Sequence, residues 1–565
     1  MTLSKDISCD VLVIGSGAGG LATAVTARKH GLDVVVVEKA PVFGGSTAFS
    51  GGVLWIPGNR RAPQDPRDSR DRAREYLKAE TGNFFQDEMV EAFLDQGPRM
   101  LDWFEAETEV KFVPTLYPDY HPLAPGGVDV GRSVLAAPFD ASALGAELKR
   151  LRPPLSTITF VGMMFNSSNA DLKHFFKATS SLASALYVAK RLARHGVEVL
   201  RHGRGVQVTS GNALAARLAA SCFALGIPIH TGAPAEGLIR DGAAVTGAVV
   251  RGADGPVRVT ARRGVVLACG GFPHDAARLR AAYPHVARGG EHVSPTPADN
   301  TGDGVRLAED AGARVEIRFP SAAAWMPVSK VPNGDGTFAA FPHLLDRYKP
   351  GVIAVLANGR RFCNESESYH DVGAAMIAAC AGAEETAAWL VCDRTTIAKY
   401  GLGYAKPAPL PLGPLIRKGY LKTGATLAEL ATACGVDPAG LEATVADYNR
   451  GAVRGVDERF HRGETAFNRY LADPEHKPNP CVAPLVRGPF YAVKLVMGDL
   501  GTFDGLKTTV EGQVFAADET PIPGLYAVGN DRASLMGGTY PGAGITLGPI
   551  MTFGFITGRH LARAA

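Results

Sequence analysis

Short apolar runs that end in glycine recur near both ends of the chain. Residues 10–14 (DVLVI) lead into GSGAGG, and the run LDVVVVEK reaches Glu38. The segment between them, LATAVTARKHG, has helical character, so the pattern predicts a strand–helix–strand unit. Two more buried strands are expected at 261–272 (ARRGVVLACGGF) and 523–530 (PGLYAVGN), each running into glycine or asparagine-glycine turns. Strands of nucleotide-binding character are therefore expected on both sides of the chain's middle.

The middle of the chain, roughly 320–500, lacks such strand–glycine junctions. The simplest architecture is therefore α/β, with a discontinuous nucleotide-binding domain into which an α+β domain is inserted. We expect residues 1–319 and 501–565 to form the two parts of the first domain. Residues 320–500 are expected to form the catalytic or substrate domain.

Residues 151–204 form a segment of different composition, an expected insertion in the first domain. It contains an apolar stretch, TITFVGMMF, and then a run of helical character in which 171–204 carries seven Lys or Arg against Asp171 and Glu198. One helical stripe is apolar: Phe175, Leu182, Leu186 and Ala189. A basic amphipathic helix can lie on an anionic membrane surface, and it can equally pack on the protein with its basic face in water.

The amino-acid composition excludes several classes of protein. Glycine is abundant, with 66 Gly in 565 residues, but no Gly-X-Y period accompanies it, so the chain is not collagen-like. A hydrophobic fraction of 46% with 20% charged residues excludes a disordered chain. Lys and Arg (59) nearly balance Asp and Glu (56), so no nucleic-acid partner is expected.

Cysteine usage and the first residues point to a cytoplasmic setting. The eight cysteines lie far apart, with no CxxC pair and no Cys/His cluster of zinc-site spacing, so no metal site is expected. A disulfide framework is the alternative to a reducing compartment. The first residues lack the basic region and cleavage site of a signal peptide, and no run of 18 apolar residues predicts a transmembrane helix.

The best-defined motif is GxGxxG at Gly15, Gly17 and Gly20, between a predicted strand and a predicted helix. In this motif the first glycine allows a tight turn, the second lets a pyrophosphate approach, and the third lets the helix pack on the strand. The phosphates then lie at the helix N-terminus. Glu38 follows 18 residues after Gly20, where a carboxylate accepts hydrogen bonds from ribose hydroxyls. These residues predict a dinucleotide cofactor.

A second glycine loop, KAPVFGGSTAFSGGVLW (39–55), favours FAD over NAD. A nicotinamide cofactor needs only the first loop, whereas this chain has four places suited to close approach of a long, flat ligand. Ser46, Thr47 and Ser50 are candidates to hydrogen-bond the pyrophosphate or the flavin edge. No second GxGxxG follows a strand, so NAD(P)H is not an evident reductant.

The chain resembles the fumarate reductase/succinate dehydrogenase flavoprotein superfamily over nearly its whole length, in the N-terminal fingerprint and in FGGST, NTGDG (300–304), GRRFCNES (359–366) and GLYAVGN. The resemblance implies a discontinuous Rossmann-like FAD-binding domain with an inserted α+β catalytic domain. Covalent-flavin members carry a His in the second glycine loop, and GGSTAFSGG has none, so FAD is expected to be non-covalent. The residues expected to contact FAD are Gly15, Gly17, Ala18, Gly19, Gly20, Glu38, Lys39, Gly45, Ser46, Thr47, Ser50, Gly51, Gly52, Ala268, Gly270, Asp303, Gly529, Asn530, Gly544, Ile545 and Leu547.

Four positions are similar to the 3-ketosteroid Δ1-dehydrogenases of that superfamily: Tyr120 in YPDYHPLAPGG, Tyr369 in NESESYHDVG, and Tyr540 with Gly544 in TYPGAG. The resemblance implies 1,2-dehydrogenation of 3-keto-4-ene steroids to 1,4-dien-3-ones. Tyr369, aided by Tyr120, is then expected to take the C2 proton. The Tyr540 hydroxyl and the Gly544 N–H are expected to polarise the C3 carbonyl while the C1 hydride passes to flavin N5. The electrons would leave to an external acceptor, for which a quinone is one candidate.

Some members that act on sterols with intact side chains are membrane-associated. Residues 151–204 are therefore expected to hold the protein peripherally on the inner face of the cell membrane. Three alternatives remain: a Δ4-(5α)-3-ketosteroid dehydrogenase, an enoate or dicarboxylate reductase of the same superfamily, and a flavin-binding membrane protein without turnover. A reductase would be marked by an Arg/His pair facing the flavin, and no comparable set stands out at the matching loops.

Overall fold

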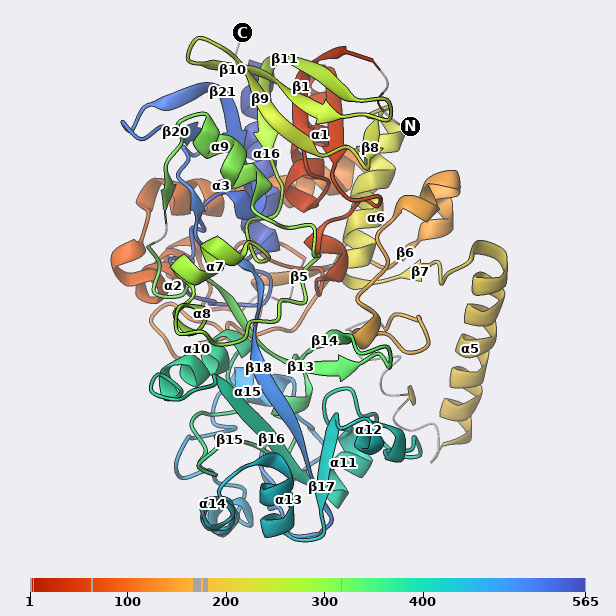
Figure 1. The fold of residues 1–565 in the computed structure, drawn as a ribbon, viewed down its shortest axis with the longest axis vertical. Coiled ribbons are helices and arrows are strands. Elements are labelled where there is room, and N and C mark those ends of the chain that lie inside the picture. The colour runs from red at the N-terminus through yellow and green to blue at the C-terminus, as the bar shows by residue number, and fades with distance from the viewer. Residues whose placement is uncertain are drawn as a thin grey trace.

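Two β-sheets organise the molecule, one drawn from distant parts of the sequence that include both ends and one from its middle (Figure 1). The computed structural model describes residues 3, 5–61, 63, 65–165, 174, 175, 181–316 and 318–563. Two stretches of the predicted insertion, 166–173 and 176–180, lie outside the described residues, and with them Asp171, Lys173 and Lys177.

The first sheet joins strands that are remote in sequence. Its strands are β1 (Ile7–Ile14), β2 (Val34–Glu38), β8 (Ile229–Thr231), β9 (Ala235–Asp241), β10 (Ala244–Arg251), β11 (Pro256–Leu267), β20 (Gln513–Phe515) and β21 (Pro521–Ala527). Along the order β21-β11-β1-β2-β8 every pair is parallel, so the carboxyl ends of these strands share one edge. In open sheets of this kind ligands bind at that edge.

Both faces of the first sheet are buried, which explains the unbroken apolar runs in its sequence. Val11 and Val13 of β1 face a core shared with the helices α1 (Ala18–Lys29), α6 (Ser210–Ala224) and α16 (Leu547–Arg563). Leu12 and Ile14 face the opposite core, which includes side chains of β9 and β10. The strands predicted near both ends of the chain therefore meet in one sheet.

The second sheet is antiparallel. Its strands are β13 (Ala323–Pro332), β14 (Phe338–Pro342), β15 (Val352–Val355), β16 (Ala387–Asp393), β17 (Leu421–Gly424) and β18 (Phe490–Thr502). Helix α10 (Tyr369–Ala379) packs on β13 at one face, and α13 (Leu427–Cys434) and α14 (Pro438–Ala452) contribute to the core at the other. The predicted fold class, a Rossmann-like α/β unit with an inserted α+β unit, is confirmed.

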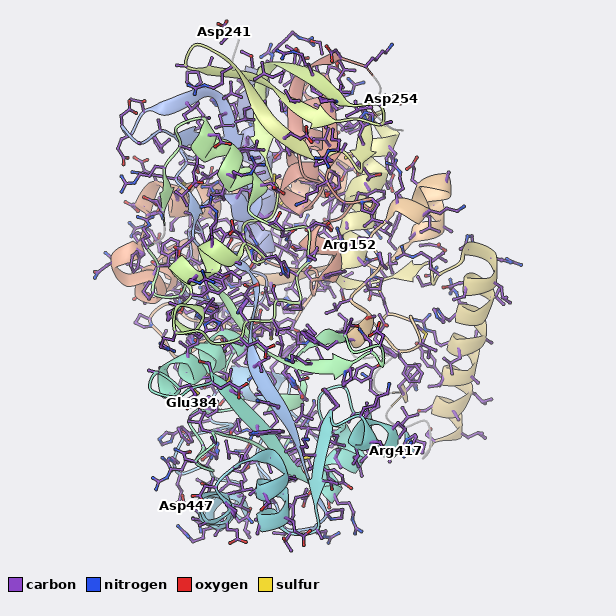
Figure 2. All side chains as sticks on the ribbon, viewed as in Figure 1. Arg152, Asp241, Asp254, Glu384, Arg417 and Asp447 are labelled. Carbon is purple, nitrogen blue, oxygen red and sulfur yellow. The ribbon has the colours of Figure 1, made fainter. Side chains whose placement is uncertain are left out.

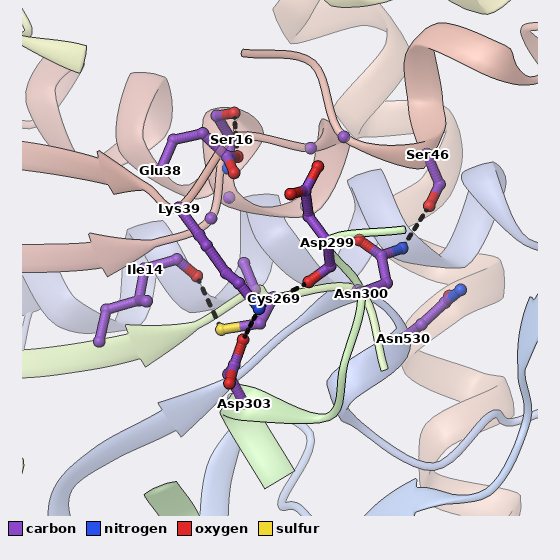
Figure 3. A pocket seen from close by; sticks show the side chains of 18 of the residues that line it. Ile14, Ser16, Glu38, Lys39, Ser46, Cys269, Asp299, Asn300, Asp303 and Asn530 are labelled. Carbon is purple, nitrogen blue, oxygen red and sulfur yellow. Dashed lines mark hydrogen bonds and ion pairs between the residues drawn. The ribbon is translucent and has the colours of Figure 1, made fainter. Parts of the chain in front are cut away.

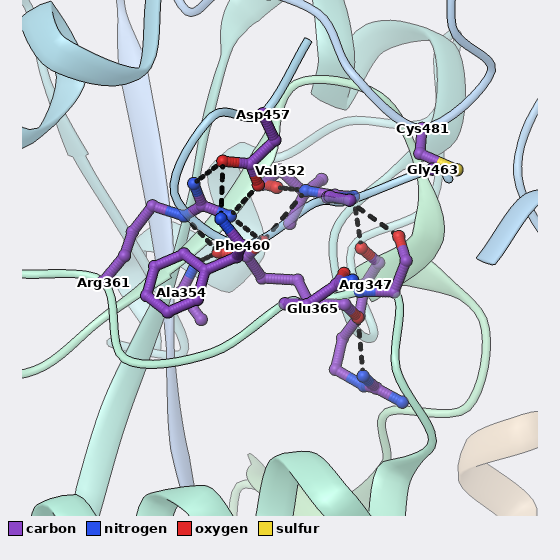
Figure 4. A network of polar contacts seen from close by, with 12 residues as sticks. Arg347, Val352, Ala354, Arg361, Glu365, Asp457, Phe460, Gly463 and Cys481 are labelled. Atoms are coloured by element: carbon purple, nitrogen blue, oxygen red, sulfur yellow. Dashed lines mark hydrogen bonds and ion pairs between the residues drawn. The ribbon is translucent and has the colours of Figure 1, made fainter. Parts of the chain in front are cut away.

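A network of buried charges fixes the chain just before α10 (Figure 4). Arg361 forms ion pairs with Glu365 at 2.6 Å and Asp457 at 2.7 Å, and Arg462 pairs with Glu365 at 3.3 Å. Although burial opposes charge on Arg361, the two carboxylates hold its pKa well above its usual range. Because Tyr369 is the first residue of α10, this network also fixes the position of that tyrosine.

Helix α5 (Leu182–His202) stands apart at the side of the molecule (Figure 1). Its buried residues are Ser184, His195 and Glu198, whereas Leu182 and Leu200 are 78% and 87% exposed. None of the described helices combines the length and the apolar character that crossing a bilayer requires.

Candidate active site

A cleft opens at the carboxyl edge of the first sheet, where the glycine loops converge (Figure 3). Fifteen of the predicted FAD-contacting residues line it: Gly15, Gly17, Ala18, Gly19, Gly20, Glu38, Lys39, Gly45, Ser46, Thr47, Ala268, Gly270, Asp303, Gly529 and Asn530. Ile545 lines a second cavity beside it, and Ser50, Gly51, Gly52, Gly544 and Leu547 line neither. Gly52 instead packs against the backbone of Ser210.

The floor of the cleft is formed by closely packed backbone, where a side chain would clash. A Cβ at Gly15, whose φ is +113°, would lie 2.1 Å from the Ala268 carbonyl oxygen, so β1 and β11 meet here only through glycine. A Cβ at Gly17, at the N-terminus of α1, would meet only the Thr47 hydroxyl, at 3.7 Å, and this is the place suited to a pyrophosphate. Glu38 accepts hydrogen bonds from the Ser16 N–H at 3.1 Å and the Ser16 hydroxyl at 2.5 Å, which orient its carboxylate toward the cleft.

The cleft also has polar residues that were not predicted from the sequence, among them Arg152, Asp299 and Asn300. Arg152 is 8% exposed and lies midway along the molecule (Figure 2), with one ion pair to Asp299 at 3.0 Å. Its Nε has no hydrogen-bond partner among the described residues, so the guanidinium retains a donor for a phosphate. Asn300 donates to the Ser46 hydroxyl at 2.8 Å. Asn300 lies in the NTGDG motif, but Arg152 lies in the insertion, where no local pattern marks it.

The lysine after Glu38 closes one side of the cleft. Lys39 Nζ lies 2.8 Å from the Asp303 carboxylate and 2.6 Å from the Thr301 hydroxyl (Figure 3). This contact ties the second glycine loop to the NTGDG segment. Lys39 and Asp303 are therefore paired with each other at the rim, where each can still reach a bound ligand.

The three predicted tyrosines come together in one buried cluster. The ring centroids of Tyr120 and Tyr540 lie 5.6 Å apart, those of Tyr369 and Tyr540 5.0 Å, and those of Tyr120 and Tyr369 6.0 Å. Each side chain is at most 8% exposed. Segments separated by about 420 residues thus deliver three phenols to one place.

Backbone contacts position Tyr120 and Tyr540. The Tyr120 N–H donates to the Pro541 carbonyl at 2.8 Å, and the Tyr76 hydroxyl donates to the same carbonyl at 2.6 Å. Gly544 has a φ of +94°, and its carbonyl accepts from the Trp55 N–H of β3 (Val53–Trp55) at 3.0 Å. The Gly544 N–H donates to no atom of the described residues, so it is available to a ligand.

Burial raises the pKa of Tyr369 well above its usual range, and the neighbouring Tyr120 and Tyr540 raise it further. Burial raises the pKa of Tyr120 and of Tyr540 as well. All three are therefore neutral phenols at neutral pH. A neutral Tyr540 is a hydrogen-bond donor, whereas Tyr369 must first give up its own proton to act as a base.

An ion network beside the tyrosines links their two segments. His121 Nδ1 lies 2.8 Å from Glu80, and Nε2 lies 3.0 Å from Asp371, on the first turn of α10. Although burial opposes charge, the hydrogen bonds to Asp371 and Glu80 raise the pKa of His121 to about 11. Glu367 lies within metal-binding distance of His121 and Asp371, but both ring nitrogens of His121 are already engaged by carboxylates.

His370 lies in the first turn of α10. The Ser368 side chain caps this helix, which begins at Tyr369. His370 Nδ1 accepts from the Trp325 N–H at 3.2 Å, and burial lowers the pKa of His370 to about 4, so this ring is neutral.

The second cavity lies beside the first. It shares Gly529, Asn530 and Ile550 with the first cavity. Phe503 lines it, and the Phe503 ring centroid lies 6.3 Å from that of Tyr540. The two cavities therefore share a wall, and the second reaches Phe503 beside the phenol cluster, although none of the three tyrosines lines either cavity. This arrangement suits a long cofactor whose reactive end points toward the tyrosines.

The family model described as FAD binding domain matches residues 10–547. The 3-oxosteroid 1-dehydrogenase of Mycolicibacterium smegmatis is 38% identical, with 98% of this chain and 97% of that protein covered. The chain belongs to the FAD-dependent 3-ketosteroid Δ1-dehydrogenase family. FAD is therefore its cofactor, and the fifteen predicted residues of the cleft are suited to hold it.

Two further relatives extend this comparison. The crystal structure of the 3-ketosteroid Δ1-dehydrogenase from Sterolibacterium denitrificans, in complex with 1,4-androstadiene-3,17-dione, superimposes with a TM-score of 0.88 at 37% identity, covering 99% of this chain and 100% of that one. A 4-oxocyclohex-2-ene-1-carboxylate 5-dehydrogenase of Sinomonas cyclohexanicum is 43% identical, with 100% of this chain and 95% of that protein covered. Relatives that match nearly the whole chain are therefore named for substrates of very different size.

Replacing His121 by Gln is expected to lower the free energy of unfolding by about 1–3 kcal/mol near pH 6, because Asp371 and Glu80 lose their shared cation. Folding raises the pKa of His121 from 6.5 to about 11, so His121 stabilises the fold fully at a pH below 6.5. That stabilisation is lost as the pH rises toward the upper value. Urea unfolding across this range should show a difference between wild type and H121Q that shrinks with rising pH.

His461→Gln provides the control, since His461 forms an exposed pair with Glu464 at 3.1 Å. We expect it to change stability by less than about 0.5 kcal/mol. A difference between wild type and H121Q that stays constant with pH would show that His121 is not held charged by its carboxylates.

Proposed function

We propose that the enzyme removes hydrogen from C1 and C2 of a 3-keto-4-ene steroid to give the 1,4-dien-3-one. The observation that carries this proposal is the cluster of Tyr120, Tyr369 and Tyr540, which lies against Phe503 of the second cavity. A flat, uncharged ring ketone needs an apolar slot with a few fixed polar groups, and these phenols with Phe503 provide such surroundings. Bound FAD supplies the acceptor for the hydride that leaves C1.

Polarisation of the C3 carbonyl is assigned to the Tyr540 hydroxyl and the Gly544 N–H. A neutral phenol and an unpartnered backbone N–H are both hydrogen-bond donors, and these two lie four residues apart in the same loop. Donors fixed in advance stabilise the negative charge that develops on the carbonyl oxygen as the C2 proton leaves. The C2 hydrogen becomes acidic only through this polarisation.

Proton abstraction is assigned to Tyr369 with Tyr120 beside it. Tyr369 is protonated in the free enzyme, so its proton has to leave before it can accept another, and Tyr120 is the adjacent hydroxyl that can take part in that transfer. The required species is the deprotonated phenol. We therefore expect kcat/KM to rise with pH through the alkaline range. The electrons leave to an external acceptor, for which a quinone is our candidate.

A second candidate substrate is a small ring ketone that carries a carboxylate. The Sinomonas relatives named 4-oxocyclohex-2-ene-1-carboxylate 5-dehydrogenase and 4-oxocyclohexanecarboxylate 2-dehydrogenase are 43% and 36% identical to this chain. The same proton and hydride losses next to a ketone would serve such a ring. The structural observation that favours it is Arg532, a buried arginine in the second cavity without an acidic partner among the described residues.

Anaerobic mixing of the holoenzyme with each substrate tests these assignments. A 3-keto-4-ene steroid is expected to bleach the flavin and give the 1,4-diene, and 4-oxocyclohex-2-ene-1-carboxylate would do so if the second candidate holds. Tyr540→Phe and Tyr369→Phe should retain FAD and slow flavin reduction by about 100- to 1,000-fold, because each removes one catalytic hydroxyl.

Tyr448→Phe is the matched control, since Tyr448 is also buried and its hydroxyl has no partner among the described residues. It should reduce its flavin at the wild-type rate. Bleaching by a 5α-3-ketosteroid alone would instead indicate the Δ4 reaction. Near-normal reduction in Tyr369→Phe or Tyr540→Phe would remove the role given to that residue.

We further propose that α5 holds the enzyme on the inner face of the cell membrane. Leu182, Leu186, Val197 and Leu200 fall within a narrow arc of the helix at 100° per residue, and all four are exposed. The buried Ser184, His195 and Glu198 fall on the opposite side, so the apolar stripe points away from the protein. Lys190, Arg194 and Arg201 follow on one side of this stripe. This arrangement suits an anionic lipid surface that also dissolves sterols.

The double variant L186E/L200E is expected to lose at least about tenfold in binding to vesicles that contain anionic lipid, because two apolar anchors become charged. Vesicle sedimentation measures the binding, and turnover of a water-soluble substrate should be unchanged. Leu123→Glu is the control, since Leu123 is 82% exposed and lies outside α5. Wild-type sedimentation of the double variant would exclude α5 as the membrane anchor.

A further inference from the structure

Arg532 is an isolated cation inside the second cavity. The residue is 7% exposed, and its guanidinium lies 3.8 Å from the centroid of the Phe553 ring. Nη2 contacts the Met89 sulfur at 3.2 Å, and Nη1 has no hydrogen-bond partner among the described residues. Burial lowers the pKa of Arg532 to about 9, and no acidic side chain offsets this effect.

The neighbouring carboxylate does not neutralise it. Asp531 accepts hydrogen bonds from the Cys269 N–H at 2.5 Å and the Gly271 N–H at 3.0 Å. Asp531 is thereby held at the end of β11. A buried guanidinium with an unused donor is unfavourable by itself, so the site favours a ligand that brings the missing negative charge.

The position of Arg532 determines which ligands can do so. Arg532 lines the second cavity together with Phe503, Ile545 and Thr546, and Gly529 and Asn530 join this cavity to the FAD cleft. Phe503 in turn lies against Tyr540. Arg532 is therefore near the place where the reactive end of the cofactor and the substrate meet.

We propose that Arg532 is an anion-binding residue of this cavity that receives a planar, delocalised anion on its free Nη1. A guanidinium is suited to such an anion because its donors lie in one plane. Two sources share this chemistry: a carboxylate on the substrate ring, or the negatively charged pyrimidine portion of reduced FAD. The first source rests on the carboxylated ring ketone considered under the proposed function, and the second requires only the FAD site.

Binding titrations of the oxidised holoenzyme test the carboxylate source without turnover. The probes are 4-hydroxybenzoate and phenol, which share a ring and differ by the carboxylate, and the flavin absorbance reports their binding. Arg532→Met should weaken 4-hydroxybenzoate by at least about tenfold and leave phenol unchanged. Arg532→Lys should recover part of the loss, because it restores the charge but not the planar donors.

Sulfite titration of the flavin tests the other source, because sulfite adds to flavin and leaves a negative charge on the pyrimidine portion. A tenfold or greater loss of sulfite affinity in Arg532→Met, with 4-hydroxybenzoate binding unchanged, would assign Arg532 to the reduced cofactor. Arg559→Met is the control, since Arg559 lies over Phe555 of the same helix at 5.2 Å but does not line the cavity. It should match wild type in every titration.

Unchanged affinity for both 4-hydroxybenzoate and sulfite in Arg532→Met would overturn the proposal. If Arg532→Met does not bind FAD, the same titrations with Arg532→Lys decide, and values within about twofold of wild type would overturn it. A steroid that fails to bleach the flavin would contradict the proposed dehydrogenation but would leave these titrations intact. The two failures are therefore distinguishable.

Discussion

The loop that carries Tyr540 is fixed by backbone contacts that leave no room for side chains. A Cβ at Gly544 would lie 2.5 Å from the Val53 carbonyl, and the Pro541 carbonyl receives both the Tyr120 N–H and the Tyr76 hydroxyl. These backbone contacts hold Tyr120 and Tyr540 relative to one another. The phenol hydroxyls form hydrogen bonds within the cluster, where Tyr369 is bonded to both Tyr120 and Tyr540.

Burial of the phenols has a further consequence. Water is excluded from the cluster, so each hydrogen bond made to a substrate carbonyl is stronger than it would be in water. The same burial keeps Tyr369 protonated, which opposes its use as a base. One environment thus favours the donor Tyr540 and hinders the acceptor Tyr369, and the hydroxyl of Tyr120 beside both is the group that can relieve the conflict.

The sequence predicted the parts of the fold and site that depend on local pattern. The strand–glycine–helix unit, Glu38 and the second glycine loop follow from spacing, and the tyrosines follow from resemblance to a family. Arg152 and Arg532 could not be found in this way, because an arginine's missing partner is visible only once distant segments have packed. The helix at Tyr369 was missed because its cap, Ser368, follows a loop with no helical pattern.

Two features outside the phenol cluster affect how the substrate reaches the enzyme and which substrate it accepts. The apolar stripe of α5 faces away from the protein, which suits delivery of a lipid-soluble substrate. Arg532 instead suits a charged one. Both lie outside the phenol cluster, so relatives that share the tyrosine chemistry can differ in substrate through residues of this kind.

A crystal structure of the enzyme with FAD and a 1,4-dien-3-one product would test the assigned roles of the tyrosines most directly. We expect the product's C3 oxygen within hydrogen-bond distance of the Tyr540 hydroxyl and the Gly544 N–H, and the Tyr369 hydroxyl beside C2. A product that binds with its C3 oxygen away from both donors would contradict these roles.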